Sequence, residues 1–216
     1  MVASAISLYQ KEEERKMEKI NPSVNSFMIG SALGDGAFVK KTENHNTYVV
    51  FKHSEKQIGY LMWKYNFLKE NGLLRDTKEV KEHKLFGCYK TNNRQFEFST
   101  KTFKELNQYK AASYDELLNR LDEFALAIWV LDDGNVCRRV TKIACGSKPK
   151  EWCMKVVEIL NNDFGLSSLY YEHPTNHIKN YITIRARSFE RLKEIVLKYV
   201  PSDLDVVKSK FGDKEN

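Results

Sequence analysis

The chain of 216 residues has no apolar run near the roughly 18 residues that a membrane-spanning helix needs. Its first residues, MVASAISLYQ, lead directly into the charged KEEERK, unlike a secretory signal peptide. Only four cysteines occur, and none forms a Cys-x-x-Cys pair, so neither a zinc ribbon nor a redox motif is indicated. They are expected to be buried thiols of a reducing compartment. These absences predict a soluble protein of the cytoplasm or an organelle, not a secreted one.

Histidine is scarce as well, and its distribution argues against a histidine metal site. His173 and His177 have helical spacing, but Pro174 between them would break the helix needed to align the rings. What the chain does contain is apolar and basic. A hydrophobic content of 42% is enough for a sizeable core, and a net charge of +6 favours a polyanionic partner such as nucleic acid without requiring one.

Two apolar segments end in an acid followed by glycine. MIGSALGDG (Met28 to Gly36) ends on Asp35, and LAIWVLDDG (Leu126 to Gly134) ends on Asp133. Both segments read as helices, and the C-terminus of a helix carries partial negative charge, so the dipole does not favour an acid there. Each acid therefore needs another reason for its position.

The segments after each acid repeat in the same order, which indicates a duplicated unit. A basic pair follows at the fifth and sixth positions in both halves. Further along, FLKENGL matches ILNNDFGL, and STKTFKEL matches RARSFERL. The basic pairs are Lys40 and Lys41 in the first half and Arg138 and Arg139 in the second.

Each half predicts the order helix, hairpin, helix, hairpin, helix. The first helix should start at Asn21 and run to Gly34, with Gly36 ending it in a left-handed conformation. A capping box of Ser113 and Glu116 should start a single helix that continues to the second acid. The second hairpins are expected at Val80 to Ser99, turning at residues 91–93, and at Leu169 to Arg187, turning near residues 174–180.

The paired motifs, the basic hairpins and the length resemble a single-chain LAGLIDADG homing endonuclease, over about Pro22 to Lys210. The resemblance implies an α+β fold of two pseudo-twofold-related αββαββα halves, each with an antiparallel four-stranded sheet, forming a saddle with the motif helices packed at its centre. We divide the chain into a charged extension (1–20), a first half (21–111) and a second half (112–216). Gly30 and Gly34 leave a groove on the first helix, and we expect the larger Ile128 and Asp132 to fill it.

In this family the terminal acids of the two motif helices meet. Two carboxylates brought together stay ionised cheaply only if a cation lies near them, and their hard oxygen ligands suit Mg²⁺ or Mn²⁺. The resemblance therefore makes Asp35 and Asp133 catalytic metal ligands, together with the backbone carbonyls of Gly34 and Asp132. The Asp132 side chain is the second choice for its half.

The resemblance also implies a lysine near each scissile phosphate and basic residues that contact DNA. Lys110, 23 residues before Asp133, fits the first lysine, and Lys208 is preferred over Lys210 and Lys198 for the second. The outward residues of the hairpins should enter the major groove, where base edges present a unique pattern of donors and acceptors. These candidates are Lys40, Lys41, Arg94, Arg138, Arg139, Arg185 and Arg187.

By this resemblance the protein is a monomeric, metal-dependent endonuclease that hydrolyses one phosphodiester per strand of a long asymmetric DNA site. A second interpretation stays open: some relatives are maturases that help an intron RNA to fold and splice. A gene regulator on this fold is disfavoured, because such relatives tend to lose the acids and both acids are present here.

Overall fold

The computed structural model describes residues 21–75, 79–83, 94–146, 148–176 and 180–212. Within these ranges no helix is both long and apolar enough to cross a membrane. The predicted turn at 91–93, Cys88 and His177 fall outside the described residues, as does the N-terminal extension.

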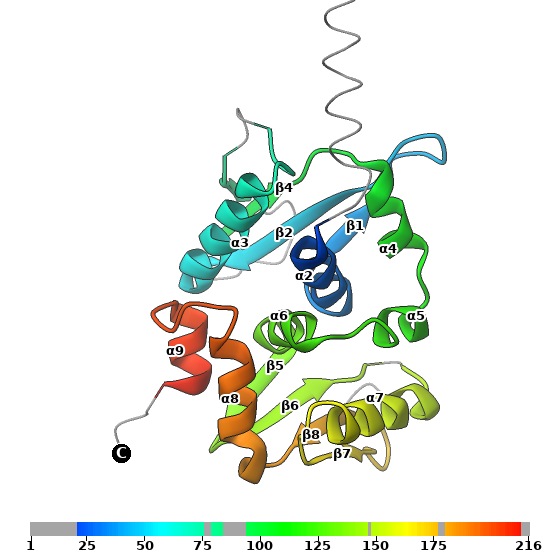
Figure 1. The fold of residues 1–216 in the computed structure, drawn as a ribbon, viewed down its shortest axis with the longest axis vertical. Helices are drawn as coiled ribbons and strands as arrows, with labels where there is room; N and C mark the ends of the chain where they lie inside the picture. The colour runs from blue at the N-terminus through cyan, green and yellow to red at the C-terminus, as the bar shows by residue number, and fades with distance from the viewer. Residues whose placement is uncertain (1–20, 76–78, 84–93, 147, 177–179, 213–216) are drawn as a thin grey trace, which may run out of the picture.

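The expected α+β architecture of two similar halves is confirmed (Figure 1). The first half runs α2 (Pro22–Leu33), β1 (Ala37–Val39), β2 (Tyr48–Ser54), α3 (Ile58–Glu70), β3 (Lys81–His83), β4 (Gln95–Ser99) and α4 (Asn107–Ala111). After the short α5 (Tyr114–Leu118), the second half runs α6 (Glu123–Asp133), β5 (Gly134–Cys137), β6 (Val140–Ala144), α7 (Lys150–Asn162), β7 (Ser168–Tyr171), β8 (Tyr181–Ile184), α8 (Phe189–Leu197) and α9 (Asp205–Phe211).

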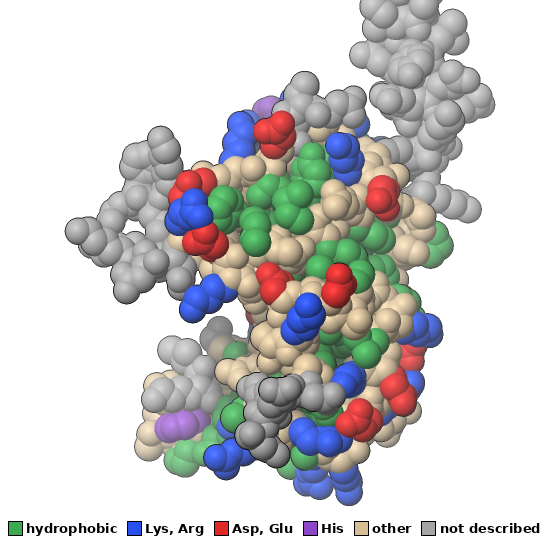
Figure 2. Space-filling view, turned by 90° about the vertical axis from the view of Figure 1, so that its left-hand side faces the viewer, with side chains coloured by type: hydrophobic (Ala, Val, Ile, Leu, Met, Phe, Trp, Pro, Cys, Tyr) green, Lys and Arg blue, Asp and Glu red, His purple; other side chains and the backbone are tan. Residues whose placement is uncertain are grey.

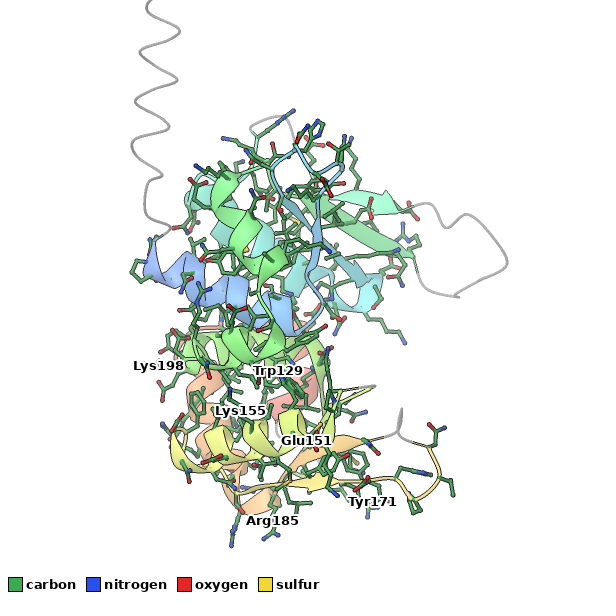
Figure 3. All side chains as sticks on the ribbon, turned by 90° about the vertical axis from the view of Figure 1, so that its right-hand side faces the viewer. Trp129, Glu151, Lys155, Tyr171, Arg185 and Lys198 are labelled. Atoms are coloured by element: carbon green, nitrogen blue, oxygen red, sulfur yellow. The ribbon has the colours of Figure 1, made fainter. Side chains whose placement is uncertain are left out.

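Each half contains one antiparallel sheet of four strands, with matching orders β1-β2-β4-β3 and β5-β6-β8-β7. The first strand of each sheet begins within two residues of the motif acid, so each acid lies where the central helix meets the sheet. Along β2, buried and half-buried residues alternate, as expected for a strand with helices on one face only. The second hairpins of both halves point to the same side of the molecule (right in Figure 3).

The two motif helices, α2 and α6, lie side by side at the centre (Figure 1). A Cβ added to Gly30 would lie 2.4 Å from the backbone oxygen of Ala125 and 2.7 Å from the Cβ of Ile128. A Cβ on Gly34 would lie 2.7 Å from that of Asp132. The glycine groove is therefore filled by the two larger residues, as predicted, and only glycine permits this approach.

Two details of the helix ends differ from the sequence prediction. Gly36 does not adopt a left-handed conformation. Glycine is needed there for a steric reason: the Gly36 N–H donates to the backbone oxygen of Ser31, and a Cβ added to Gly36 would lie 2.7 Å from that oxygen. The helix expected to run unbroken from Ser113 is two helices, α5 and α6. Its capping box is present, but Asp122 starts a new helix by accepting a hydrogen bond from the Ala125 N–H.

Apolar burial concentrates on the central helices. Every residue from Ala125 to Leu131 is buried, and Phe27, Met28 and Ile29 of α2 are fully enclosed. Phe27 stacks on Phe67 with ring centroids 4.9 Å apart, which joins α2 to α3. A helix buried on nearly all sides fixes its polar terminus rigidly, so the acids at the ends of α2 and α6 have a firm support.

Candidate functional site

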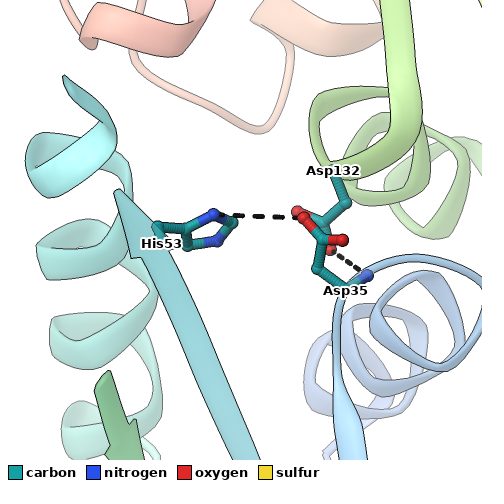
Figure 4. A group of neighbouring side chains, drawn as sticks. All are labelled: Asp35, His53 and Asp132. Carbon is teal, nitrogen blue, oxygen red and sulfur yellow. Dashed lines mark hydrogen bonds and ion pairs between the residues drawn. The ribbon is translucent and has the colours of Figure 1, made fainter. Parts of the chain in front are cut away.

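The crossing of α2 and α6 brings Asp35, Asp132 and Asp133 together at the C-terminal ends of both helices. The Asp35 N–H donates to Oδ2 of Asp132 over 3.3 Å, which links the two motifs directly (Figure 4). The side chain of Asp35 is 44% exposed, and Asp133 is half-buried. Two acids with solvent access therefore border one fully enclosed acid.

Burial and the charges of neighbouring acids both raise the pKa values of these acids. Burial, and next the charge of Asp132, raise the pKa of Asp35 above its ordinary value. Burial, followed by the charges of Asp35 and Asp132, raises the pKa of Asp133 from 3.8 to about 6. A cation beside these carboxylates would oppose both effects. Asp35 and Asp133 thus offer two accessible carboxylates beside further negative charge from Asp132, and such oxygen ligands fit a hard divalent cation.

Asp132 is not one of the accessible ligands. Its side chain is fully buried; Oδ1 accepts from Lys64 Nζ at 2.6 Å and from the Tyr60 hydroxyl at 2.9 Å. Burial and the nearby Asp132 carboxylate raise the pKa of Tyr60 well above 10.0, so the phenol keeps its proton and donates. These bonds occupy Oδ1 of Asp132, whereas Asp133 is half-buried, so Asp133 stays the predicted ligand from the second motif.

His53 is a neighbour of the acids that the motif comparison did not identify. Its Nδ1 lies 4.0 Å from Oδ2 of Asp35, and one ligand atom from each of Asp35, His53 and Asp132 lies within 4.8 Å of the others (Figure 4). Burial and the charge of Lys64 lower the pKa of His53 to about 4, so the ring is neutral at pH 7. The alternation of β2 is the signal that could have placed it inward, beside Val49 and Phe51.

A second lysine near the acids, besides Lys64, is Lys210 of α9. Its Nζ donates to the backbone oxygens of Leu131 at 2.6 Å and Val130 at 3.0 Å, at the end of α6. Burial lowers the pKa of Lys210 to about 8, against the opposing pull of Asp132, Asp35 and Asp133. The sequence interpretation ranked Lys208 above Lys210, but Lys208 is exposed on the same helix.

The other lysines considered for this role are placed elsewhere. Lys110 lies exposed on α4 and is not among the charges that act on Asp35 or Asp133. Lys198 pairs with Glu123 at the N-terminal end of α6, at the opposite end from the acids. The backbone carbonyls proposed as ligands, those of Gly34 and Asp132, belong to helix ends, where carbonyls lack intrahelical partners.

The basic pairs occupy corresponding turns of the two sheets. Lys40 and Lys41 are exposed in the connection from β1 to β2. Arg138 and Arg139 form the two-residue turn from β5 to β6, both with positive φ, 49° and 65°. Arg139 pairs with Glu190, which leaves Arg138 as the freer guanidinium of this turn.

The remaining predicted arginines are less suited to an open sheet face. Arg94 pairs with exposed Glu55 at the start of β4. The prediction that the last strand extends to Arg187 is wrong: β8 ends at Ile184 and a 3-10 turn follows. Arg185 and Arg187 line a shallow polar hollow with residues of α7 and the start of β7, and Figure 3 shows Arg185 at the far end of the second half.

Two lysines that the sequence interpretation did not single out lie on the central strands. Lys52 of β2 and Lys142 of β6 have side chains on the face opposite the buried residues of their strands. Lys142 Nζ lies 4.5 Å from the centroid of the Tyr181 ring on the next strand. Figure 2 shows an indentation of the molecular surface at the left edge, between the upper and the lower half.

Comparison with known proteins agrees with this architecture. The model of the LAGLIDADG DNA endonuclease family matches residues 25–192. The cytochrome b mRNA maturase bI2 of Saccharomyces cerevisiae is 23% identical over 219 residues, which cover 94% of this chain and 51% of that protein. The chain thus spans about half the length of this curated relative.

Solved structures show the same fold. The homing endonuclease I-WcaI bound to its DNA recognition sequence has a TM-score of 0.71 at 19% identity, covering 93% of this chain and 90% of that one. I-DmoI in complex with DNA and Mn has a TM-score of 0.54 at 15% identity, covering 83% and 98%. With two motif acids at the crossing of paired central helices, and a family match over most of its length, the chain belongs to the LAGLIDADG DNA endonuclease family.

Proposed function

We propose that the protein is a monomeric, site-specific endonuclease that cuts both strands of a DNA duplex with Mg²⁺ or Mn²⁺ as cofactor. The observation that supports this proposal is the position of both motif acids where α2 and α6 end: the Asp35 N–H donates to Asp132, and the charge of Asp35 helps to raise the pKa of Asp133. A fold alone would not support an activity, but neighbouring acids with raised pKa values are typical of functional sites. One chain supplies both acids, so a second copy is not needed.

The residues have separate roles in this proposal. Asp35 and Asp133, with the backbone carbonyls of Gly34 and Asp132, would hold the metal. A bound divalent cation supplies an activated water and neutralises the charge of the leaving oxygen. Lys210 places a cation close to the acids at a pKa of about 8, where it stabilises phosphate charge and can exchange a proton. Lys110 stays a candidate for the other strand on sequence spacing alone.

The sheets would bind the duplex on either side of the acids. The basic turns carry the predicted DNA contacts Lys40, Lys41, Arg138 and Arg139, while Lys52 and Lys142 lie on the faces of the central strands opposite the buried residues. Base edges read in the major groove by the outer residues give specificity, and phosphate contacts by the lysines give affinity. The scissile phosphates then lie across the minor groove above Asp35 and Asp133.

The test is cleavage of a randomised plasmid library, and of the DNA that flanks the gene, in Mg²⁺, Mn²⁺, Ca²⁺ or EDTA. We expect double-strand breaks at one long site in Mg²⁺ or Mn²⁺. Asp35→Asn and Asp133→Asn should abolish cutting and leave binding within a few-fold. A protein that binds one site but leaves both strands intact with each metal would refute the nuclease, and equal losses of binding and cutting would mark the acids as structural.

A second function is supported by the similarity to the yeast mRNA maturase. A maturase would use its surface charge to bind an intron RNA and would not need the two acids. Splicing of the intron that surrounds the gene, measured with wild-type protein and with the double variant Asp35→Asn/Asp133→Asn, separates the functions. Splicing that survives the double substitution indicates a maturase. Such a maturase would act in the cytoplasm or in an organelle, where such introns are spliced.

A further inference from the structure

A buried ion pair lies directly beneath the first motif acid. Lys64 and Asp132 are both fully enclosed, and the Lys64 Nζ also lies 4.5 Å from the centroid of the Tyr60 ring. Lys64 and Tyr60 belong to α3 of the first half, whereas Asp132 belongs to α6 of the second. The pair therefore joins the two halves of the molecule at the site itself.

Both oxygens of this carboxylate accept hydrogen bonds from specific donors. Oδ1 receives the Lys64 ammonium and the Tyr60 hydroxyl, and Oδ2 receives the Asp35 N–H at 3.3 Å. The peptide of Asp35 is thus tied through Asp132 to an ammonium and a phenol held in the core. Side chains locked in this way can fix an accessible ligand to within a fraction of an ångström.

The arrangement has no counterpart in the other half. Asp132 corresponds to Gly34 in the repeated motif, which has no side chain to offer. Helices α3 and α7 have the same length of 13 residues, and the repeat that aligns them pairs Lys64 with Val156 and Tyr60 with Trp152. Both of these counterparts are buried and uncharged. The Asp133 N–H, which corresponds to that of Asp35 and lies within α6, is therefore not supported by an equivalent Asp–Lys–Tyr cluster.

A role in stability alone does not account for this pair well. A buried ion pair is often no more stabilising than well-packed apolar residues of the same volume, and Val156 and Trp152 show that the same positions accept apolar side chains in this fold. The pair lies within hydrogen-bond reach of a proposed metal ligand, because Asp132 accepts the Asp35 N–H.

We propose that Asp132, held by Lys64 and Tyr60, is a positioning residue that fixes the Asp35 peptide, and that its presence in one half only makes cleavage of the two DNA strands unequal. This inference depends on the proposed nuclease for its kinetic consequence. Its structural claim, that Asp132 orders the Asp35 N–H, stands independently of any activity.

The experiment compares wild-type full-length protein with the double variant Asp132→Ala/Lys64→Met, which removes both charges and leaves neither stranded. The control is Asp115→Ala/Lys155→Met, the same two substitutions in a solvent-exposed pair with an Nζ to Oδ1 distance of 3.3 Å. For each protein, hydrogen exchange of the Asp35 amide is measured by NMR without metal. Each strand carries its own label, so the two first-order cleavage rates in Mg²⁺ are measured separately, and thermal midpoints are recorded.

We expect the Asp35 amide to exchange faster in the Asp132→Ala/Lys64→Met variant than in the control. The ratio of the two strand-cleavage rates should also change by about tenfold or more, because small misplacements at a reacting centre have large kinetic effects. Cleavage of one strand should fall behind, so nicked DNA accumulates. Unchanged exchange at Asp35, or slowing of both strands by one factor in step with the thermal midpoint, would overturn the proposal. If the wild-type protein cuts no DNA, the nuclease is refuted while the exchange measurement still decides the positioning claim.

Discussion

Replacing Asp133 by asparagine should stabilise the metal-free protein, although it removes a proposed catalytic group. The pKa of this acid is raised from 3.8 to about 6 in the folded state. A group with a raised acidic pKa binds its proton more tightly when folded, so folding stability falls as the pH rises from about 4 to about 6 and the penalty persists above that. At about 1.4 kcal/mol per pH unit the full penalty would be roughly 3 kcal/mol.

Solvent reduces this figure. Asp133 is only half-buried, and screening of a partly exposed charge brings the expected gain for Asp133→Asn at pH 7.5 to about 1–2 kcal/mol. For a domain of this size that corresponds to a rise in the thermal midpoint of roughly 2–8 °C. At pH 4 the folded wild-type carboxyl is largely protonated and the unfolded one, with an ordinary pKa of 3.8, is only about half ionised, so most of the gain should disappear.

The assay is urea denaturation in EDTA at pH 4 and pH 7.5, repeated at pH 7.5 with Mg²⁺. Mg²⁺ should stabilise the wild-type protein, because it binds the folded state, and should stabilise Asp133→Asn less. Asp203→Asn, an exposed acid before α9, is the control and should change stability little in any condition. If Asp133→Asn destabilises the metal-free protein at pH 7.5, the carboxylate has structural partners and the strained-site reasoning is wrong.

Three further predictions concern the lysines and the helix crossing. Lys210→Met should slow cutting by roughly 10²-fold with DNA binding retained, whereas Lys208→Met should cut normally in the same strand-resolved assay; the reverse result would restore the original ranking. Gly30→Ala should lower the free energy of unfolding by about 1–3 kcal/mol or more, since its Cβ would lie 2.4 Å from a backbone oxygen of the partner helix, and a neutral effect in urea denaturation would contradict the close packing. Lys142→Ala should weaken DNA binding and reduce the slope of the logarithm of the binding constant against the logarithm of the salt concentration by about one. Arg187→Ala should leave that slope unchanged. Equal effects of the two substitutions would mean that the duplex also reaches the end of the second half.

Local sequence rules predicted much of the fold. The Asn21 and Ser113 caps, the order of helices and hairpins, and the glycine groove on α2 all follow from short-range chemistry, and the structure confirms them. The break between α5 and α6 was missed because its apolar spacing continues across Asp122, a residue whose capping bond competes with helix continuation.

The repeat in the sequence determined that there would be two similar halves, each ending its central helix on an acid, because a motif and its flanking elements recur in register. Only the tertiary structure decided which side chains surround those acids. The alternation of β2 can place His53 inward, but its approach to the acids, like that of Lys64 and Lys210, depends on how β2, α3 and α9 pack, which no local pattern encodes. Of the adjacent acids, Asp132 points into the core and Asp133 is partly exposed to solvent. Asp132 points inward because the Lys64 ammonium and the Tyr60 hydroxyl, both on α3, bind its carboxylate.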